Sequence, residues 1–167
     1  MIKTWQKRSP EEANLFNPAF ISSLIYEFSK EFKKHKSAAA PIVFVPMMLA
    51  AILHEKTRKR LPHSTVTSLY QWLQDNEDLK IGFSDRCIGI LPYSKESIMF
   101  GMCRSTLVFD NGYGIGTGEV KAHFPASFIQ NTTAETKEII DRTKFMARWL
   151  AKSGSEASIM GAWGVKP

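Results

Sequence analysis

The chain reads NPAFISSLIYEFSKEFKKHK from Asn17 to Lys36, and this stretch decides the fold class. Asn17 can cap a helix in which Pro18 occupies the first position. Apolar side chains then recur at helical spacing and form a wide stripe, comprising Phe20, Ile21, Leu24, Ile25, Phe28 and Phe32. Lysines gather near the end of the stretch, where positive charge compensates the helix dipole. We therefore predict a long helix that packs on the core.

A second helix start lies just before this stretch. Ser9-Pro10-Glu11-Glu12 has the form of a capping box. In that motif the Ser9 side chain accepts a hydrogen bond from the backbone N–H of Glu12, and the Glu12 side chain reaches back. Pro10 is favoured at the first helical position. A short helix is therefore expected here.

After Lys36, residues 46–55 are nearly all apolar, which is typical of a helix enclosed by the rest of the protein. The surrounding apolar stretch, 38–53, is about 16 residues long, whereas a membrane span needs about 20. Pro41 and Pro46 also interrupt it. We expect this stretch in the core.

Further helices are predicted up to residue 103. Ser64 can cap a helix that residues 75–78 end. Its apolar face comprises Val66, Leu69, Tyr70 and Leu73. A helical stretch over 79–91 is expected to stop before Pro92, and Ser94 opens another helix after a very short turn.

One region favours strands. Residues 106–109 are rich in β-forming side chains, Asp110-Asn111-Gly112 is a strong tight-turn signal, and residues 113–117 can return as a second strand. Helix, short turn, helix and hairpin is the element order of a winged helix-turn-helix. Beyond the hairpin, Thr133 can cap a long helix over 134–152, followed by a short apolar tail.

The composition agrees with one folded domain over residues 1–167. With 44% hydrophobic and 23% charged residues, the chain differs from disordered, coiled-coil and disulfide-rich proteins. We predict a mainly α-helical single domain with one β-hairpin, and winged helix-turn-helix-like as the more specific interpretation.

Cysteine usage and the N-terminal segment both indicate a cytoplasmic location. Cys87 and Cys103 are too few for a disulfide scaffold, and we expect both thiols to be reduced and buried. The first 20 residues lack the apolar run of a signal peptide.

No motif in the sequence points to catalysis. The histidines lack the spacing that would direct two ring nitrogens at one metal: His35, His54, His63 and His123. The glycines of 112–118 fall within the hairpin, where turn geometry explains them better than a phosphate-binding loop does. The sequence therefore predicts no catalytic residue, cofactor or metal, and an enzyme is the weakest class.

The formal net charge of +6 suits an acidic partner. The densest basic run is a candidate contact for nucleic acid or for an acidic partner, and comprises Lys56, Arg58, Lys59 and Arg60. A solvated charged face is the alternative. Because residues 105–120 contain no Lys or Arg, the hairpin argues against direct reading of DNA.

Large aromatic side chains lie near both ends of the chain, at positions that normally fray. Trp5, with Arg8 close by, and Trp163 either fold back on the core or bind a partner, since Trp and Arg are enriched at interface hot spots. We regard these three residues as candidate partner contacts, with internal packing as the alternative.

Four segments together carry a family resemblance that runs from one end of the chain to the other. They are TWQKRSPEEANLFNPAF (4–20), LPHST (61–65), AHFPASF (122–128) and KSGSE with AWGVKP (152–156 and 162–167). The chain resembles the middle component of bacterial three-component ABC ATPase systems. That family has no established catalytic motif.

The resemblance implies a bacterial conflict system similar to Lamassu anti-phage defence. In such a system an SMC-like ABC ATPase works with an effector, often a nuclease, and a small middle subunit connects them. We therefore expect a non-enzymatic adaptor that meets DNA through the complex rather than directly. The alternative from the residues alone is a winged-helix DNA-binding protein or repressor.

Overall fold

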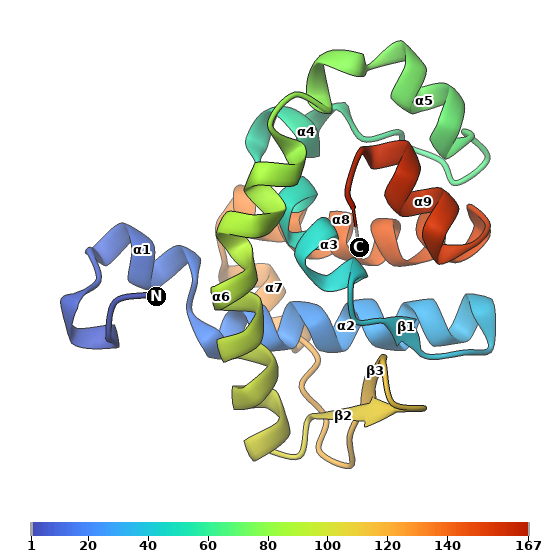
Figure 1. The fold of residues 1–167 in the computed structure, drawn as a ribbon. Helices are drawn as coiled ribbons and strands as arrows, with labels where there is room; N and C mark the ends of the chain where they lie inside the picture. Colours follow the sequence, from blue (N-terminus) through green and yellow to red (C-terminus); the bar gives the residue numbers. More distant parts are fainter. Residues whose placement is uncertain (1, 167) are drawn as a thin grey trace.

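The computed structural model describes residues 2–166, and this part of the chain is mainly helical (Figure 1). In chain order the elements are a 3₁₀ turn η1 (Trp5–Lys7), α1 (Pro10–Leu15), α2 (Pro18–Lys36), β1 (Ala40–Pro41), α3 (Phe44–Ile52), α4 (Glu55–Arg60), α5 (Leu69–Asp75), a 3₁₀ turn η2 (Glu77–Leu79), α6 (Phe83–Cys103), β2 (Leu107–Asp110), β3 (Gly114–Thr117), α7 (Ala126–Asn131), α8 (Ala134–Lys152) and α9 (Glu156–Trp163).

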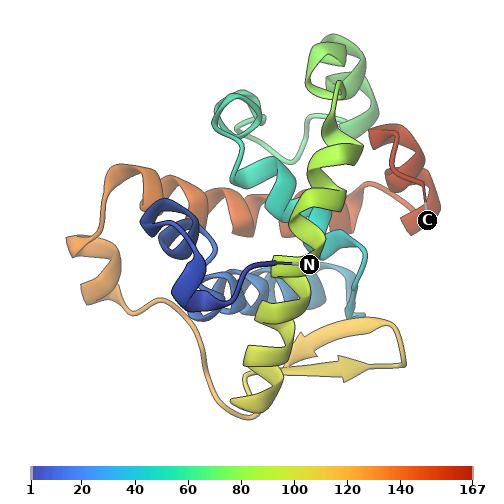
Figure 2. The ribbon, with the colours of Figure 1, turned by 60° about the vertical axis from the view of Figure 1, so that its left-hand side comes forward.

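Helix α2 lies at the centre of the fold. Its residues from Ile21 to Ser29 are buried except for Ser23, so this part of the helix is covered on every side. Helices α6 and α8 and strand β3 pack against it (Figures 1 and 2). This arrangement confirms the predicted packing of α2 on the core, although three of the buried residues are polar: Ser22, Glu27 and Ser29.

The predicted caps of three helices are present. The Asn17 side chain accepts a hydrogen bond of 2.9 Å from the backbone N–H of Ala19. Ser9 caps α1 and Thr133 caps α8 in the same way, through the backbone N–H groups three residues on. The capping box of α1 is only half formed, because the Glu12 carboxylate accepts a hydrogen bond from the Tyr93 hydroxyl instead of reaching back.

The predicted hairpin is confirmed, and a third strand joins it. Strands β2 and β3 pair antiparallel around a turn in which Asn111 and Gly112 have positive φ angles of 52° and 82°. The short strand β1 pairs with the other edge of β3, giving the order β1-β3-β2. Leu107 and Ile115 are buried, so one face of this small sheet belongs to the core around α2.

The predicted turn at Pro92 is wrong, because α6 is one continuous helix from Phe83 to Cys103. Proline removes a helical hydrogen bond, yet packing on both sides holds the helix together. Its buried residues lie before and after Pro92: Phe83, Cys87, Ile90, Ser94, Ser97, Ile98 and Gly101. The helix pair on which the winged helix-turn-helix interpretation rested is therefore a single helix.

Two boundaries also differ from the sequence expectation. Helix α5 begins at Leu69 with Ser68 at its N-cap, not after Ser64, and Val66 is exposed in the preceding turn. The basic run, for which no helix was predicted, forms the short helix α4.

The apolar stretch around α3 is part of the core. Every residue of α3 except Pro46 is buried. None of the helices in the described part of the chain combines the length and the apolar character that a bilayer crossing requires.

The two cysteines differ in environment. Cys87 is buried, and desolvation raises the pKa of its thiol to about 12. Cys103 is exposed at the end of α6, so the prediction that both thiols are buried is wrong for this residue. At the end of α6 the side chains of Met102 and Cys103 are exposed, and the sequence pattern alone did not predict this exposure.

Two glycines in α6 offer a matched test of how tightly this helix packs. A Cβ atom on Gly101 would lie 2.6 Å from Cδ1 of the buried Leu107, whereas a Cβ on Gly89 would meet nothing within 4 Å. We expect Gly101→Ala to lower the free energy of unfolding by about 1–3 kcal/mol through overpacking. Gly89→Ala is expected to raise it by about 0.5–1 kcal/mol, because alanine favours the helix. Urea denaturation measures both, and stabilisation by Gly101→Ala would contradict the packing of α6 on β2.

Candidate interaction surface

Trp163 lies in the interior. Its side chain is buried at the end of α9, where the indole stacks on the ring of Phe83 with centroids 4.2 Å apart. The ring of Trp72 lies 5.8 Å away on another side. These contacts join α9 to α5 and α6, and they give Trp163 the internal role that was the alternative to partner binding.

Arg8 fastens the N-terminal segment to the flank of α6. Its Nη2 donates a hydrogen bond of 2.7 Å to Oε1 of Glu96, and its side chain is 1% exposed. The guanidinium lies over the rings of Trp5 and Tyr93, at 5.4 and 5.5 Å from their centroids. The hydrogen bond to Glu96 raises the pKa of Arg8, and burial opposes that shift. Arg8 is therefore occupied within the chain.

The same flank of α6 holds α1. Phe16 stacks on Tyr93 with centroids 4.1 Å apart, and the Tyr93 hydroxyl donates to Glu12. None of the residues of η1 or α1 is buried, so these polar and aromatic contacts hold the segment in place. Of the three predicted partner contacts, Trp5, Arg8 and Trp163, only Trp5 presents a large surface to solvent, at 47% exposure.

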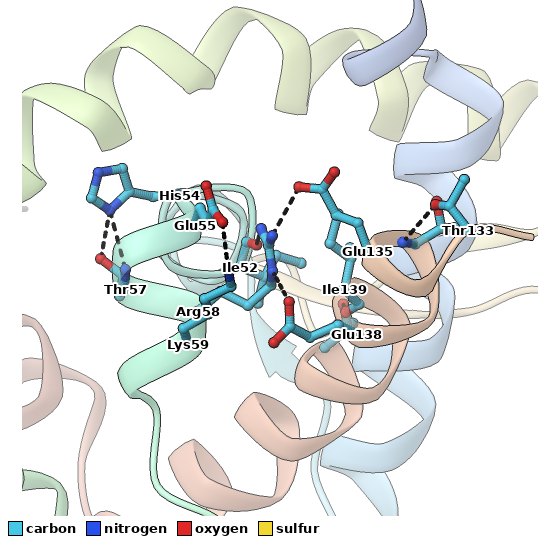
Figure 3. A network of polar contacts seen from close by, with 12 residues as sticks. Ile52, His54, Glu55, Thr57, Arg58, Lys59, Thr133, Glu135, Glu138 and Ile139 are labelled. Atoms are coloured by element: carbon cyan, nitrogen blue, oxygen red, sulfur yellow. Dashed lines mark hydrogen bonds and ion pairs between the residues drawn. The ribbon is translucent and has the colours of Figure 1, made fainter.

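Arg58 lies at the centre of a polar network that joins three helices (Figure 3). It is 2% exposed, and its Nε and Nη2 donate to Glu138 and Glu135 of α8, each at 2.8 Å. Its Nη1 donates to the backbone carbonyl of Ile52 at the end of α3, also at 2.8 Å. The guanidinium thus bonds α4 to α3 and α8, and it is not available to a phosphate in this arrangement.

The other three cations of the basic run are also paired. Lys56 and Arg60 contact the same carboxylate oxygen of Asp78, at 2.8 and 2.7 Å. The hydrogen bonds from Arg60 and then Lys56 lower the pKa of Asp78 to about 2. Lys59 pairs with Glu55 one turn away on the helix surface. The run is therefore exposed at Lys56, Lys59 and Arg60, but its charge is largely neutralised by neighbouring carboxylates.

An apolar surface that sequence reasoning missed lies along α6. Among the exposed residues of α6, which also include Asp85, Gly89 and Cys103, five at spacings of three or four form a stripe that we call the outer face of α6: Ile88, Leu91, Lys95, Met99 and Met102. Ile88 and Met99 are 65% and 66% exposed. Contiguous exposed apolar side chains on a folded protein commonly mark a binding surface.

The spacing of these residues was visible in the sequence, but the predicted break at Pro92 divided the pattern between two helices. Pro92 itself lies on the same side of the helix as Ile88 and is partly exposed. Had the helix been read through the proline, the outer face would have been found as an apolar stripe opposite the buried one.

Metal and phosphate sites were not predicted from the sequence. Among residues 2–166, no group of three His, Cys, Asp or Glu side chains lies close enough to hold a metal ion. The glycines of the hairpin serve its geometry, since Gly112 has a positive φ angle and Gly114 approaches the Cβ atom of Ala39 too closely for a side chain.

Residues 5–167 match the family model described as ABC-three component (ABC-3C) system Middle Component 3, so the chain belongs to this family of middle components. No curated protein and no solved structure matches the chain.

The burial of Arg58 can be tested against its exposed neighbour Lys59. We expect Arg58→Ala to lower the free energy of unfolding by about 2–4 kcal/mol, because the Ile52 carbonyl loses its donor and the side chain leaves a cavity. Lys59→Ala removes only an exposed pair and is expected to leave stability within experimental error. Urea denaturation of the two variants measures the difference. Equal, small effects would place Arg58 at the surface.

Proposed function

We propose that this protein is a non-enzymatic adaptor that connects the other components of its three-component system. The observation that carries the proposal is membership of the middle-component family over residues 5–167. A middle component works together with further subunits, and the exposed apolar outer face of α6 offers a surface through which such a subunit can bind.

The resemblance seen in the sequence supports a more specific setting. Under this proposal the partners are an SMC-like ABC ATPase and an effector, often a nuclease, in a cytoplasmic complex of Lamassu-like anti-phage or anti-plasmid defence. The adaptor would restrain or position the effector and meet DNA through the assembled complex. The setting requires no cofactor, metal or catalytic residue in this chain.

A winged-helix DNA-binding protein or repressor is the second candidate function. The positive net charge of +6 favours it. The pairing of the basic run weakens it, because Arg58 is buried between two glutamates and Lys56 and Arg60 are both paired with Asp78. The adaptor is therefore the function that these contacts favour.

Co-expression with the other two components tests the proposal. We expect a tag on this chain to retain both of them through size-exclusion chromatography as one complex of defined stoichiometry. The chain alone is expected to bind a short DNA duplex weakly in a salt series, with little change in affinity between low and physiological salt. Failure to form the complex, together with tight DNA binding that weakens steeply with salt, would favour the repressor.

A further inference from the structure

We infer that the outer face of α6 binds an amphipathic helix of another component of the system, with the apolar side of that helix against Ile88 and Met99 and a carboxylate against Lys95. This inference rests on the proposed adaptor function and names the surface and the partner chemistry that carry it.

The apolar content of the outer face is high for a surface exposed to water. Ile88, Leu91, Met99 and Met102 are 65%, 38%, 66% and 37% exposed. They follow one side of a helix of 21 residues, which is about 30 Å long. Burying such side chains against another protein is favourable, since apolar area leaves water.

The opposite side of α6 makes the outer face rigid. Cys87, Ile90 and Ile98 are buried, and α6 packs against both α2 and α3. On its flank, Arg8 and Tyr93 hold the N-terminal segment through Glu96 and Glu12. A helix anchored in this way presents its outer side chains before binding, so little ordering is required when a partner arrives.

The shape of the surface suits a helix. Side chains spaced by three and four residues form ridges that pack into the grooves of a second helix. Two of the exposed apolar residues are methionines, whose flexible side chains adapt to the surface they meet. Trp5 is held at the flank of the same helix through Arg8, which bonds to Glu96.

The cations on and beside the outer face favour a partner that carries carboxylates. Lys95 lies within the apolar stripe, and among residues 2–166 no carboxylate oxygen lies within ion-pair distance of it. Arg104, just beyond Met102, is also exposed and has its guanidinium over the ring of Phe100. A partner helix that carries Asp or Glu beside its apolar side would pair with Lys95 as that cation loses water.

The net charge of the chain disfavours a second copy of this chain as the occupant. Each copy carries a net charge of +6, so two copies repel over distances of about a Debye length. An acidic amphipathic helix is attracted instead. We therefore assign the outer face to a partner of different sequence.

A photo-crosslinking experiment on the co-expressed complex tests this assignment. p-Benzoylphenylalanine replaces Met99 in one variant and the exposed apolar Val66, before α5, in a matched control. We expect Met99→p-benzoylphenylalanine to crosslink to another component at a helical segment that contains Asp or Glu, and the Val66 variant to give no such product. Mass spectrometry of the crosslinked peptides identifies the segment.

Substitutions in the same complex give a second measurement. Met99→Asp and Lys95→Glu are expected to weaken binding of the other component by tenfold or more, while Val66→Asp changes it less than twofold. Unchanged circular dichroism and melting of each variant show that folding is preserved.

The outcomes separate the two proposals. A complex that forms with no crosslink from position 99, or with a crosslink only between two copies of this chain, overturns the assignment and leaves the adaptor function standing. A crosslink to a segment without acidic residues overturns the charge pairing with Lys95. Absence of any complex from the wild-type chain overturns the adaptor function and the inference together.

Discussion

The burial of α2 is the constraint on which the rest of the structure depends. Because every residue from Ile21 to Ser29 except Ser23 is buried, the elements that follow must surround the helix, and α6, α8 and the small sheet do so (Figure 2). Ion pairs also join α2 to α8: Glu27 and Glu31 of α2 lie 3.9 and 3.5 Å from Lys144 and Arg148. With α2 enclosed, α6 exposes one side to water, and that side carries the apolar side chains of Ile88, Leu91, Met99 and Met102.

Several charged side chains hold separate parts of the chain together. Arg8 bonds the N-terminal segment to α6, Arg58 bonds α4 to α8, and Asp78 gathers Lys56 and Arg60. Arg58 was a candidate nucleic-acid contact in the sequence. In the network of Figure 3 its guanidinium is bonded within the chain instead. The surplus of +6 therefore does not mark the basic run as a DNA contact. It favours an acidic partner elsewhere, and Lys95 lies where such a partner would bury it.

Local signals in the sequence predicted what depends on local physics. Asn17, Ser9 and Thr133 cap their helices as expected, and the turn at Asn111 and Gly112 forms the hairpin. The errors arise where distant packing outweighs a local preference. Pro92 is a strong helix-ending signal, yet contacts with α2 and α3 keep α6 continuous, and this one error concealed the outer face. The burial of Arg58 and Trp163 likewise depends on residues far away in sequence.

Methyl NMR of the chain labelled at its methionines tests the central claim most directly, because the seven methionines include exposed and buried ones. Met99 and Met102 lie on the outer face of α6, whereas Met47 and Met48 are buried in α3 and serve as internal controls. When the other components are added, the account predicts that the methyl signals of Met99 and Met102 shift or broaden while those of Met47 and Met48 keep their positions. Formation of the complex with unchanged Met99 and Met102 signals would contradict it.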